Sequence, residues 1–313
     1  MLGKTAGGLY WMFRYLERAG NTARLIEAGF RIALTRSTDP ESEWKSIIVT
    51  SASQAAFEAK YSTYDSTNVT DFLLRDPDNP NSVLSVIKVA RDNARLVRTA
   101  LTTEVWSSVN ETWMLFNRIL KDPVPETDLP EVLEAIRQQS SLVRGAHNGT
   151  MLRNDIYDFC RLGTFIERMD STSRIIDVKY HALLPAASFV GSRMDNVQWE
   201  MILRSVSAHA AFRWAVDGDY DAPNIANFLI LDPRLPRSLA YCASQLVSNL
   251  EYLAQDYGEP SQSLELARNL QARLKGHDIG SILDEGLHEF LTQFISDTAA
   301  LGFQIEQDYR FNA

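Results

Sequence analysis

The chain contains only two cysteines among its 313 residues, Cys160 and Cys242, and both lie in otherwise apolar helical patterns. Such sparse use argues against a disulfide framework and predicts buried free thiols in a reducing cytoplasm. Basic residues are outnumbered as well: 31 lysines and arginines stand against 40 acidic residues, for a net charge of −9. An acidic chain of this kind is not expected to bind nucleic acid or an anionic membrane surface. No stretch approaches about eighteen uncharged apolar residues, so neither a membrane span nor a signal peptide is predicted.

Motifs for metal and nucleotide chemistry are also missing. The five histidines form no metal-binding pair with a matching set of carboxylates, so no metal site is predicted. Gly3-Lys4-Thr5 lacks the preceding glycine-rich run of a phosphate loop, and no nucleophile motif is present. We therefore expect no cofactor and no ATP binding by this chain alone.

Two stretches 150 residues apart read as versions of one helix. Residues 15–27 are YLERAGNTARLIE, and residues 165–177 are FIERMDSTSRIID. Self-similarity at this distance indicates an internal duplication. The identical pairs are Glu17/Glu167, Arg18/Arg168, Thr22/Thr172, Arg24/Arg174 and Ile26/Ile176.

The similarity continues well beyond these helices. FLLRDPDNPNS at 72–82 is echoed by FLILDPRLPRS at 228–238, with six of eleven positions identical. The offset between copies grows from 150 to 156 residues, and loops absorb such insertions at little cost. The sequence predicts a single helical domain over 1–313, built from two related halves at about 1–145 and 146–313.

Apolar residues recur at helical spacing along most of the chain, and no period-two strand pattern appears. The expected long helices include 7–36, 42–62, 150–184, 195–215 and 279–310, with Pro and capping residues at the breaks. Helical hairpins of this length pack as bundles. The predicted fold class is therefore all-α, an internally duplicated helical bundle whose halves pack as one compact unit.

Each of the related helices carries a polar strip opposite its apolar stripe. Three interpretations stay open: Glu and Arg bridge helices across the bundle, they line a ligand pocket, or they form a solvent-exposed face. Facing strips would make a charged seam, and such seams persist as paired networks or as sites for charged ligands. Because the planar arginine fork suits carboxylate and phosphate, an anionic or peptide-like ligand is one hypothesis. The candidate seam or binding residues are Glu17, Arg18, Arg24, Glu167, Arg168 and Arg174.

Several segments resemble the bacterial alpha-E family of helical proteins, which is named for a Glu-Arg motif. They are the opening GLYWMFRYLERAGNTARL, the two turns at 72–82 and 228–238, the stretch 144–168, and GLHEFL at 286–291. The resemblance covers essentially the whole chain. It implies an all-helical fold and association with a circularly permuted ATP-grasp ligase, in a setting of peptide or amide-bond synthesis or modification.

The Glu-Arg pairs at 17–18 and 167–168 match the family motif, whereas Gly20 and Met169 depart from its usual Ala-Glu continuation. The resemblance favours a non-catalytic helical partner of an ATP-grasp-type ligase, or a subunit that presents the ligase's substrate. The alternative is an enzyme acting on a carboxylate- or amine-bearing metabolite or peptide, with Glu as acid/base and Arg as anion clamp. A homo-oligomeric structural protein is a third option, so whether the chain catalyses a reaction is left open here.

Overall fold

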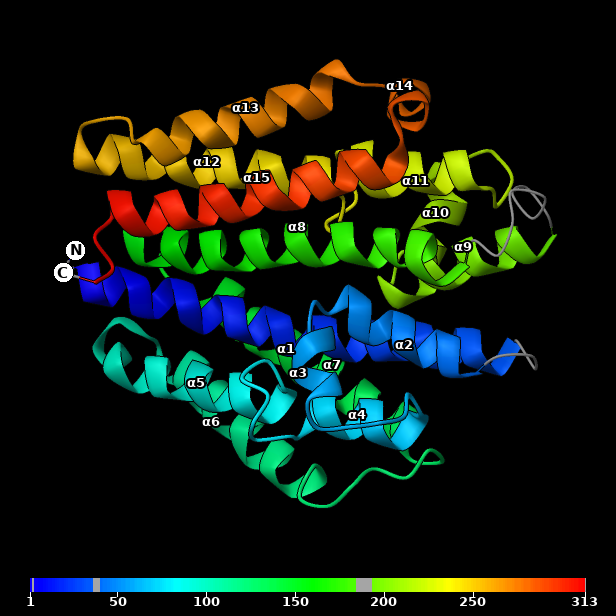
Figure 1. Cartoon of the computed structure of the whole chain (residues 1–313). Coiled ribbons are helices and arrows are strands. Elements are labelled where there is room, and N and C mark those ends of the chain that lie inside the picture. Colours follow the sequence, from blue (N-terminus) through cyan, green and yellow to red (C-terminus); the bar gives the residue numbers. More distant parts are fainter. Residues whose placement is uncertain (2, 36–39, 184–192, 313) are drawn as a thin grey trace.

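The computed structural model describes residues 1, 3–35, 40–183 and 193–312, and within these ranges all regular structure is helical (Figure 1). The expected all-α fold is thereby confirmed. The last residues of the expected helices 7–36 and 150–184 lie outside the described residues. The first eight elements are α1 (Gly3–Thr35), α2 (Pro40–Thr50), α3 (Gln54–Glu58), α4 (Ser66–Leu74), α5 (Val83–Leu96), η1 (Arg98–Ala100), α6 (Thr103–Ile119) and α7 (Leu129–Thr150). The others are α8 (Asp155–Leu183), α9 (Arg193–Ser205), α10 (His209–Ala215), α11 (Ala222–Leu231), α12 (Leu239–Tyr257), α13 (Gln262–Gly276), α14 (Ile279–Glu285) and α15 (Leu287–Asp308).

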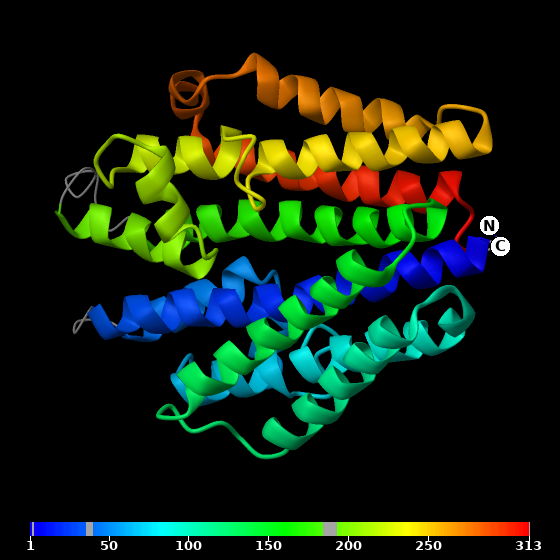
Figure 2. The ribbon, with the colours of Figure 1, turned by 180° about the vertical axis from the view of Figure 1, so that it is seen from behind.

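The two longest helices, α1 and α8, lie side by side through the middle of the molecule (Figures 1 and 2). On one side α1 packs against α5 and α7, which α6 covers; on the other, α8 packs against α12 and α15, which α13 covers. The shorter helices cross between these groups, because α2 contacts α8 and α9 contacts α1. The central pair is therefore enclosed from both sides.

Several helices begin directly after an Asp or Ser residue that caps their first turn. Asp and Ser side chains accept a hydrogen bond from the amide three residues later, which satisfies a donor that the first turn leaves free. Matching caps occur at the same elements of the two groups, before α4 and α11 and before α5 and α12. These caps are Asp65, Asp221, Ser82 and Ser238.

Three expected long helices are interrupted. The segment 42–62 breaks between α2 and α3, and 195–215 breaks between α9 and α10, each at a residue with positive φ: Ala52 at 55° and Ser207 at 58°. The segment 279–310 breaks at Gly286, where φ is 107°. The prediction that each of these three segments is one continuous helix is therefore wrong, because a residue with positive φ ends the regular hydrogen-bond pattern.

A glycine sets the close approach of the two central helices. A Cβ added to Gly163 of α8 would lie 2.1 Å from the carbonyl oxygen of Tyr10 in α1. Only a residue without a side chain fits there, so the helix backbones pack directly against each other. This contact fixes where the polar strips of α1 and α8 meet.

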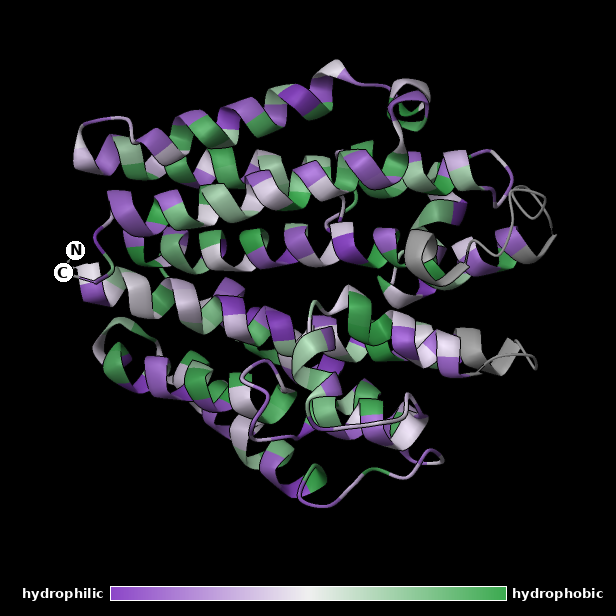
Figure 3. Ribbon diagram, in the orientation of Figure 1, coloured by the Kyte–Doolittle hydropathy of each residue, from purple (hydrophilic) through white to green (hydrophobic). Residues whose placement is uncertain are grey.

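Both cysteines are buried and unpaired, as expected from their apolar surroundings. Of the helices described, none combines the length and apolar character needed to cross a membrane. The central helices nevertheless carry hydrophilic residues along their middle portions (Figure 3). Because α1 and α8 are enclosed, those polar groups lie inside the bundle.

Candidate functional site

The two Glu-Arg pairs are crossed between the central helices. Glu17 of α1 accepts hydrogen bonds from Nε and Nη2 of Arg168 in α8, at 3.0 and 3.2 Å. Glu167 of α8 accepts from Nε and Nη2 of Arg18 in α1, at 2.6 and 2.9 Å. Both contacts are bidentate, which is the strongest geometry for an arginine and a carboxylate. Each helix therefore neutralises the charge of the other.

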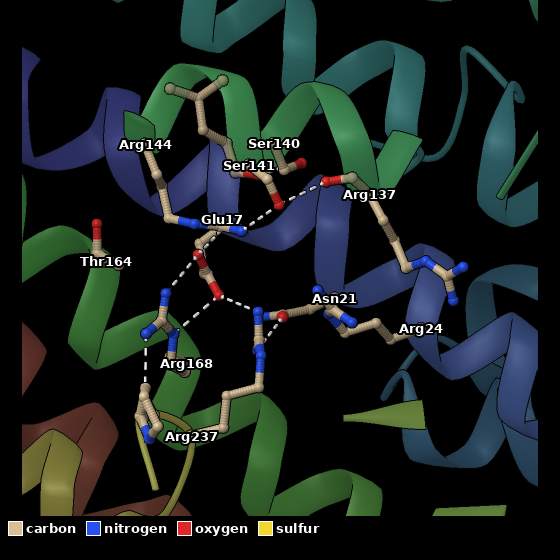
Figure 4. Close-up of polar contacts among 12 residues, drawn as sticks. Glu17, Asn21, Arg24, Arg137, Ser140, Ser141, Arg144, Thr164, Arg168 and Arg237 are labelled. Carbon is tan, nitrogen blue, oxygen red and sulfur yellow. Dashed lines mark hydrogen bonds and ion pairs between the residues drawn. The ribbon is translucent and has the colours of Figure 1, made fainter. Parts of the chain in front are cut away.

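Glu17 binds two further arginines (Figure 4). Arg144 of α7 donates to Oε2 at 3.0 Å, and Arg237, in the turn before α12, donates to Oε1 at 3.0 Å. Burial alone would raise the pKa of Glu17, but the charges of Arg168, Arg237 and Arg144 outweigh it and hold the pKa well below its usual value. Glu17 is 2% exposed, so this carboxylate is a buried junction of four elements, α1, α7, α8 and the turn before α12.

Glu167 has a similar but more open environment. Arg14 donates to Oε2 at 3.1 Å, beside the two bonds from Arg18. Burial raises the pKa of Glu167, and the charges of Arg18 and Arg14 more than compensate, so that the pKa is lowered. The remaining end of Arg18 donates to Asn81 at 2.7 Å. This half of the seam reaches nearer to the surface, because the Arg18 side chain is 24% exposed.

The other two candidate residues, Arg24 and Arg174, lie one to two turns farther along the same helices and join neither crossed pair. Arg174 donates to Asp170 of its own helix at 2.8 and 3.1 Å. Arg24 donates to the hydroxyl of Ser207 at 2.7 Å and to the carbonyl oxygen of Ser205 at 3.4 Å. The six candidates therefore divide into four residues of a crossed seam and two arginines in different surroundings.

The geometry decides between the interpretations of the polar strips for the two glutamates. A solvent-exposed face is wrong for Glu17 and Glu167, which are 2% and 4% exposed. The hydrogen bonds show that both glutamates bridge α1 and α8. Truncating one partner of a buried, bonded ion pair costs about 3–5 kcal/mol, so the seam holds α1 and α8 in register.

Sequence reasoning did not identify Arg144 and Arg237 as partners of Glu17. One signal for Arg237 was available: it occupies the position of Asn81 in the repeated turn, where the second version has gained a positive charge. Arg144 begins the family-like stretch 144–168, but nothing in the sequence around it points to Glu17 as its partner.

Among the described residues, no group of three or more His, Cys, Asp or Glu is placed to hold a metal ion. Of the four histidines whose burial is described, His147 is the most buried, and it is packed between the rings of Phe13 and Tyr157, each with its centroid 4.5 Å away. Burial lowers the pKa of His147 to about 3. It is therefore a neutral residue of the core.

The comparisons with known proteins agree with this architecture. Over 92% of its length the chain is 21% identical to uncharacterised proteins of Mycobacterium bovis and Mycobacterium tuberculosis. The chain spans about a third of the length of these relatives, 34% of each. No solved structure matches the chain. The Alpha-E family model, described as a predicted α-helical domain with a conserved ER motif, matches residues 1–309, and the chain therefore belongs to the Alpha-E family.

Proposed function

We propose that this chain is a non-catalytic helical subunit that works with an ATP-grasp-type ligase and presents the ligase's carboxylate-bearing substrate. The observation that carries the proposal is the state of the two motif glutamates. Between them they accept seven hydrogen bonds from five arginines, so that neither carboxylate has the role of a free acid or base.

The alternative function, an enzyme with Glu as acid/base, needs a carboxyl group that gains and loses a proton near neutral pH. The arginines lower the pKa of both Glu17 and Glu167, which is opposite to the shift that such a group requires. A substrate would also have to displace a buried guanidinium to reach either oxygen pair. A docking and scaffolding role needs neither step.

The ligase partner rests on the family resemblance. The relatives support it in one respect, since about two thirds of each lies outside the part that this chain matches. In those proteins the matching segment is covalently joined to further chain. This arrangement is consistent with a module that acts beside another polypeptide.

We also infer that the two groups of helices are related by duplication. The order from α1 to α6 parallels that from α8 to α13, and α7 takes the place on α1 that α15 takes on α8. Ala52 and Ser207, the two positive-φ breaks, are 155 residues apart, within the drift of the repeat. Because α7 is continuous through residue 145, the proposed halves meet in the turn between α7 and α8.

The partnership is tested by light scattering coupled to size exclusion, with the purified chain and an ATP-grasp-type ligase of the same organism. We expect one peak with the summed mass of a complex at micromolar concentrations. We also expect ligase turnover of ATP with an amine and a carboxylate substrate to rise at least tenfold when the chain is added. Glu265→Gln, a change at an exposed position of α13, serves as the control variant.

Two results would contradict the proposal. One is separate elution together with the same ligase turnover with and without the chain. The other is conversion of a carboxylate or amine substrate by the chain alone that is lost in Glu17→Gln protein of unchanged circular dichroism, which would favour the enzyme.

A further inference from the structure

Arg24 and Arg174 occupy corresponding positions of the two motif helices but differ in their partners. Arg174 is neutralised by Asp170, one turn earlier on α8, through two hydrogen bonds. The residue one turn before Arg24 is Gly20, which has no carboxylate. A Cβ at Gly20 would lie 2.9 Å from the hydroxyl of Ser140 in α7, so the tight packing of α7 on α1 excludes an acidic side chain there. The cation of Arg24 is therefore left without the counter-charge that Arg174 has.

Arg24 is nonetheless the more deeply buried of the two. It is 6% exposed, and its nearest partners are the neutral oxygens of Ser205 and Ser207. Its Nε is buried and forms no hydrogen bond among the described residues. Burial lowers the pKa of Arg24 to about 10, with the charges of Arg144 and Arg137 acting in the same direction and that of Glu17 opposing them. An unpaired, buried cation is costly, and its persistence calls for an anion that comes from outside.

A cavity borders this arginine. It has a volume of about 590 Å³, within the range of pockets that bind small ligands. Its walls come from α1, from α7 and from the turn between α9 and α10. Figure 4 shows Arg24 and Arg137 lying on the side of Glu17 away from Arg144. The side chains that give the cavity its charge and polarity include Arg24, Arg31, Arg137, Arg204, Ser207 and His209.

The local charge is strongly positive. Seven guanidinium groups, three of them at Glu17 and four at this cavity, face four carboxylates, those of Glu17, Glu27, Glu134 and Glu200. The acids at the cavity are both already bound: Glu27 pairs with Arg31 and Arg137, and Glu134 pairs with Arg137. Arg204, at the rim, is paired with Glu200. This excess of positive charge, inside a protein whose net charge is −9, favours the binding of an anion.

We propose that this cavity, between α1, α7 and the α9–α10 turn, is the binding site for a carboxylate of the substrate, held by Arg24. The carboxylate takes the place that Asp170 occupies at Arg174. The inference deepens the substrate-presenting part of the proposed function and rests on it, while binding itself is a property of this chain alone. Carboxylate is preferred to phosphate because it is the group that the corresponding arginine already binds within the fold.

The binding test is isothermal titration calorimetry on the full chain without ligase. The probes are the dipeptide Glu-Glu with a free C-terminus, Gln-Gln amide as the match that has the same amino group but no carboxylate, and inorganic phosphate. We expect Glu-Glu to bind with a submillimolar Kd, and Gln-Gln amide and phosphate to bind at least tenfold more weakly. Equal binding of Gln-Gln amide, or tighter binding of phosphate, would overturn the carboxylate assignment.

Variants locate the site. Arg24→Met is expected to weaken Glu-Glu binding at least tenfold, while Arg174→Met, the matched control, stays within about twofold of wild type. The melting temperature of Arg24→Met should be unchanged or raised, since the variant removes an unpaired buried cation. Arg24→Lys keeps the charge and loses the planar fork, and we expect at least threefold weaker binding from it.

The variants also separate this inference from the ligase partnership. Arg24→Met protein should still elute with the ligase. If Arg24→Met and Arg24→Lys both bind Glu-Glu like wild type, or if Arg174→Met is the variant that loses binding, the site is not at Arg24. Loss of ligase association by wild-type protein, with Glu-Glu binding intact, would instead count against the partnership and leave the cavity assigned.

Discussion

Glu17 of α1 and Arg168 of α8 are joined by two hydrogen bonds of 3.0 and 3.2 Å, across a sequence separation of 151 residues. The Glu and Arg next to them in sequence, Arg18 and Glu167, are joined in the opposite direction. A Glu-Arg dipeptide on one helix cannot form such a contact with itself, because adjacent helical residues point in different directions. The motif therefore needs both of its copies, because each copy binds the other. Its main effect is to align the two helices α1 and α8.

The two motif glutamates should differ in their effect on stability. Glu17→Gln leaves three arginines around a neutral side chain, and we expect a loss of about 3–5 kcal/mol in the free energy of unfolding. Glu167→Gln leaves two arginines, both partly exposed, and should cost about 1–3 kcal/mol because water replaces part of the lost charge. Urea denaturation of both variants measures the difference. Equal losses would show that the number of arginines does not set the cost.

Stability should fall steeply in acid. The folded-state pKa values of Glu17 and Glu167 are both lowered, so the stability that they contribute is present above their ordinary pKa, about 4.5, and is lost as the pH falls through their folded pKa values. Urea midpoints between pH 6 and pH 3 test this. We expect the decline in wild type to be steeper than in a Glu167→Gln variant. Parallel curves would mean that Glu167 does not titrate on acid unfolding.

Asp158 should act in the opposite direction. It is 5% exposed, and burial, with the charges of Asp256 and Asp155, raises its pKa to about 7. A raised acid pKa gives stability that is full below the unfolded value and is lost as the pH rises through about 7. Asp158→Asn should therefore stabilise the protein by more than about 1 kcal/mol at pH 8, and by less at pH 5. A gain that is the same at both pH values would contradict the shift.

The approach of α1 to α8 depends on Gly163. Alanine there would collide with the carbonyl of Tyr10, and such overpacking costs about 1–3 kcal/mol despite the better helix propensity of alanine. Gly145 of α7 is the control, because a Cβ on it meets nothing within 4 Å. Gly145→Ala should stabilise by about 0.5–1 kcal/mol. Thermal unfolding of the two variants tests the pair, and a stabilising Gly163→Ala would contradict the close packing.

Much of the fold could be predicted, because helical periodicity and caps are local. The Asp and Ser residues before α4, α5, α11 and α12 end up as caps, and the apolar spacing predicts the helices between them. The breaks at Ala52 and Ser207 could not be predicted, since neither segment contains the Gly or Pro that usually marks a left-handed turn. Tertiary packing imposes these turns on ordinary residues.

Part of the site could also be predicted, because periodicity and repetition are visible in the sequence. Periodicity gives the face on which Glu17 lies, and repetition singles out Glu167 and the two motif arginines. Neither periodicity nor repetition shows which helix each face meets. The sequence therefore groups Arg174 with the seam, although Arg174 is bound by Asp170 of its own helix. Arg144 reaches Glu17 through the three-dimensional placement of α7, which leaves no local pattern in the sequence, and Arg237 is marked only by its difference from Asn81 in the repeated turn.

The central claim is that the crossed pairs hold α1 and α8 together. A double-mutant cycle on Glu17→Gln and Arg168→Met, followed by urea denaturation, measures it most directly. The account predicts a coupling energy above about 1.5 kcal/mol, because each single change leaves the other group buried without its main partner. Additive effects, within about 0.5 kcal/mol, would contradict it and would show that the contact between the two motif helices contributes no stability of its own.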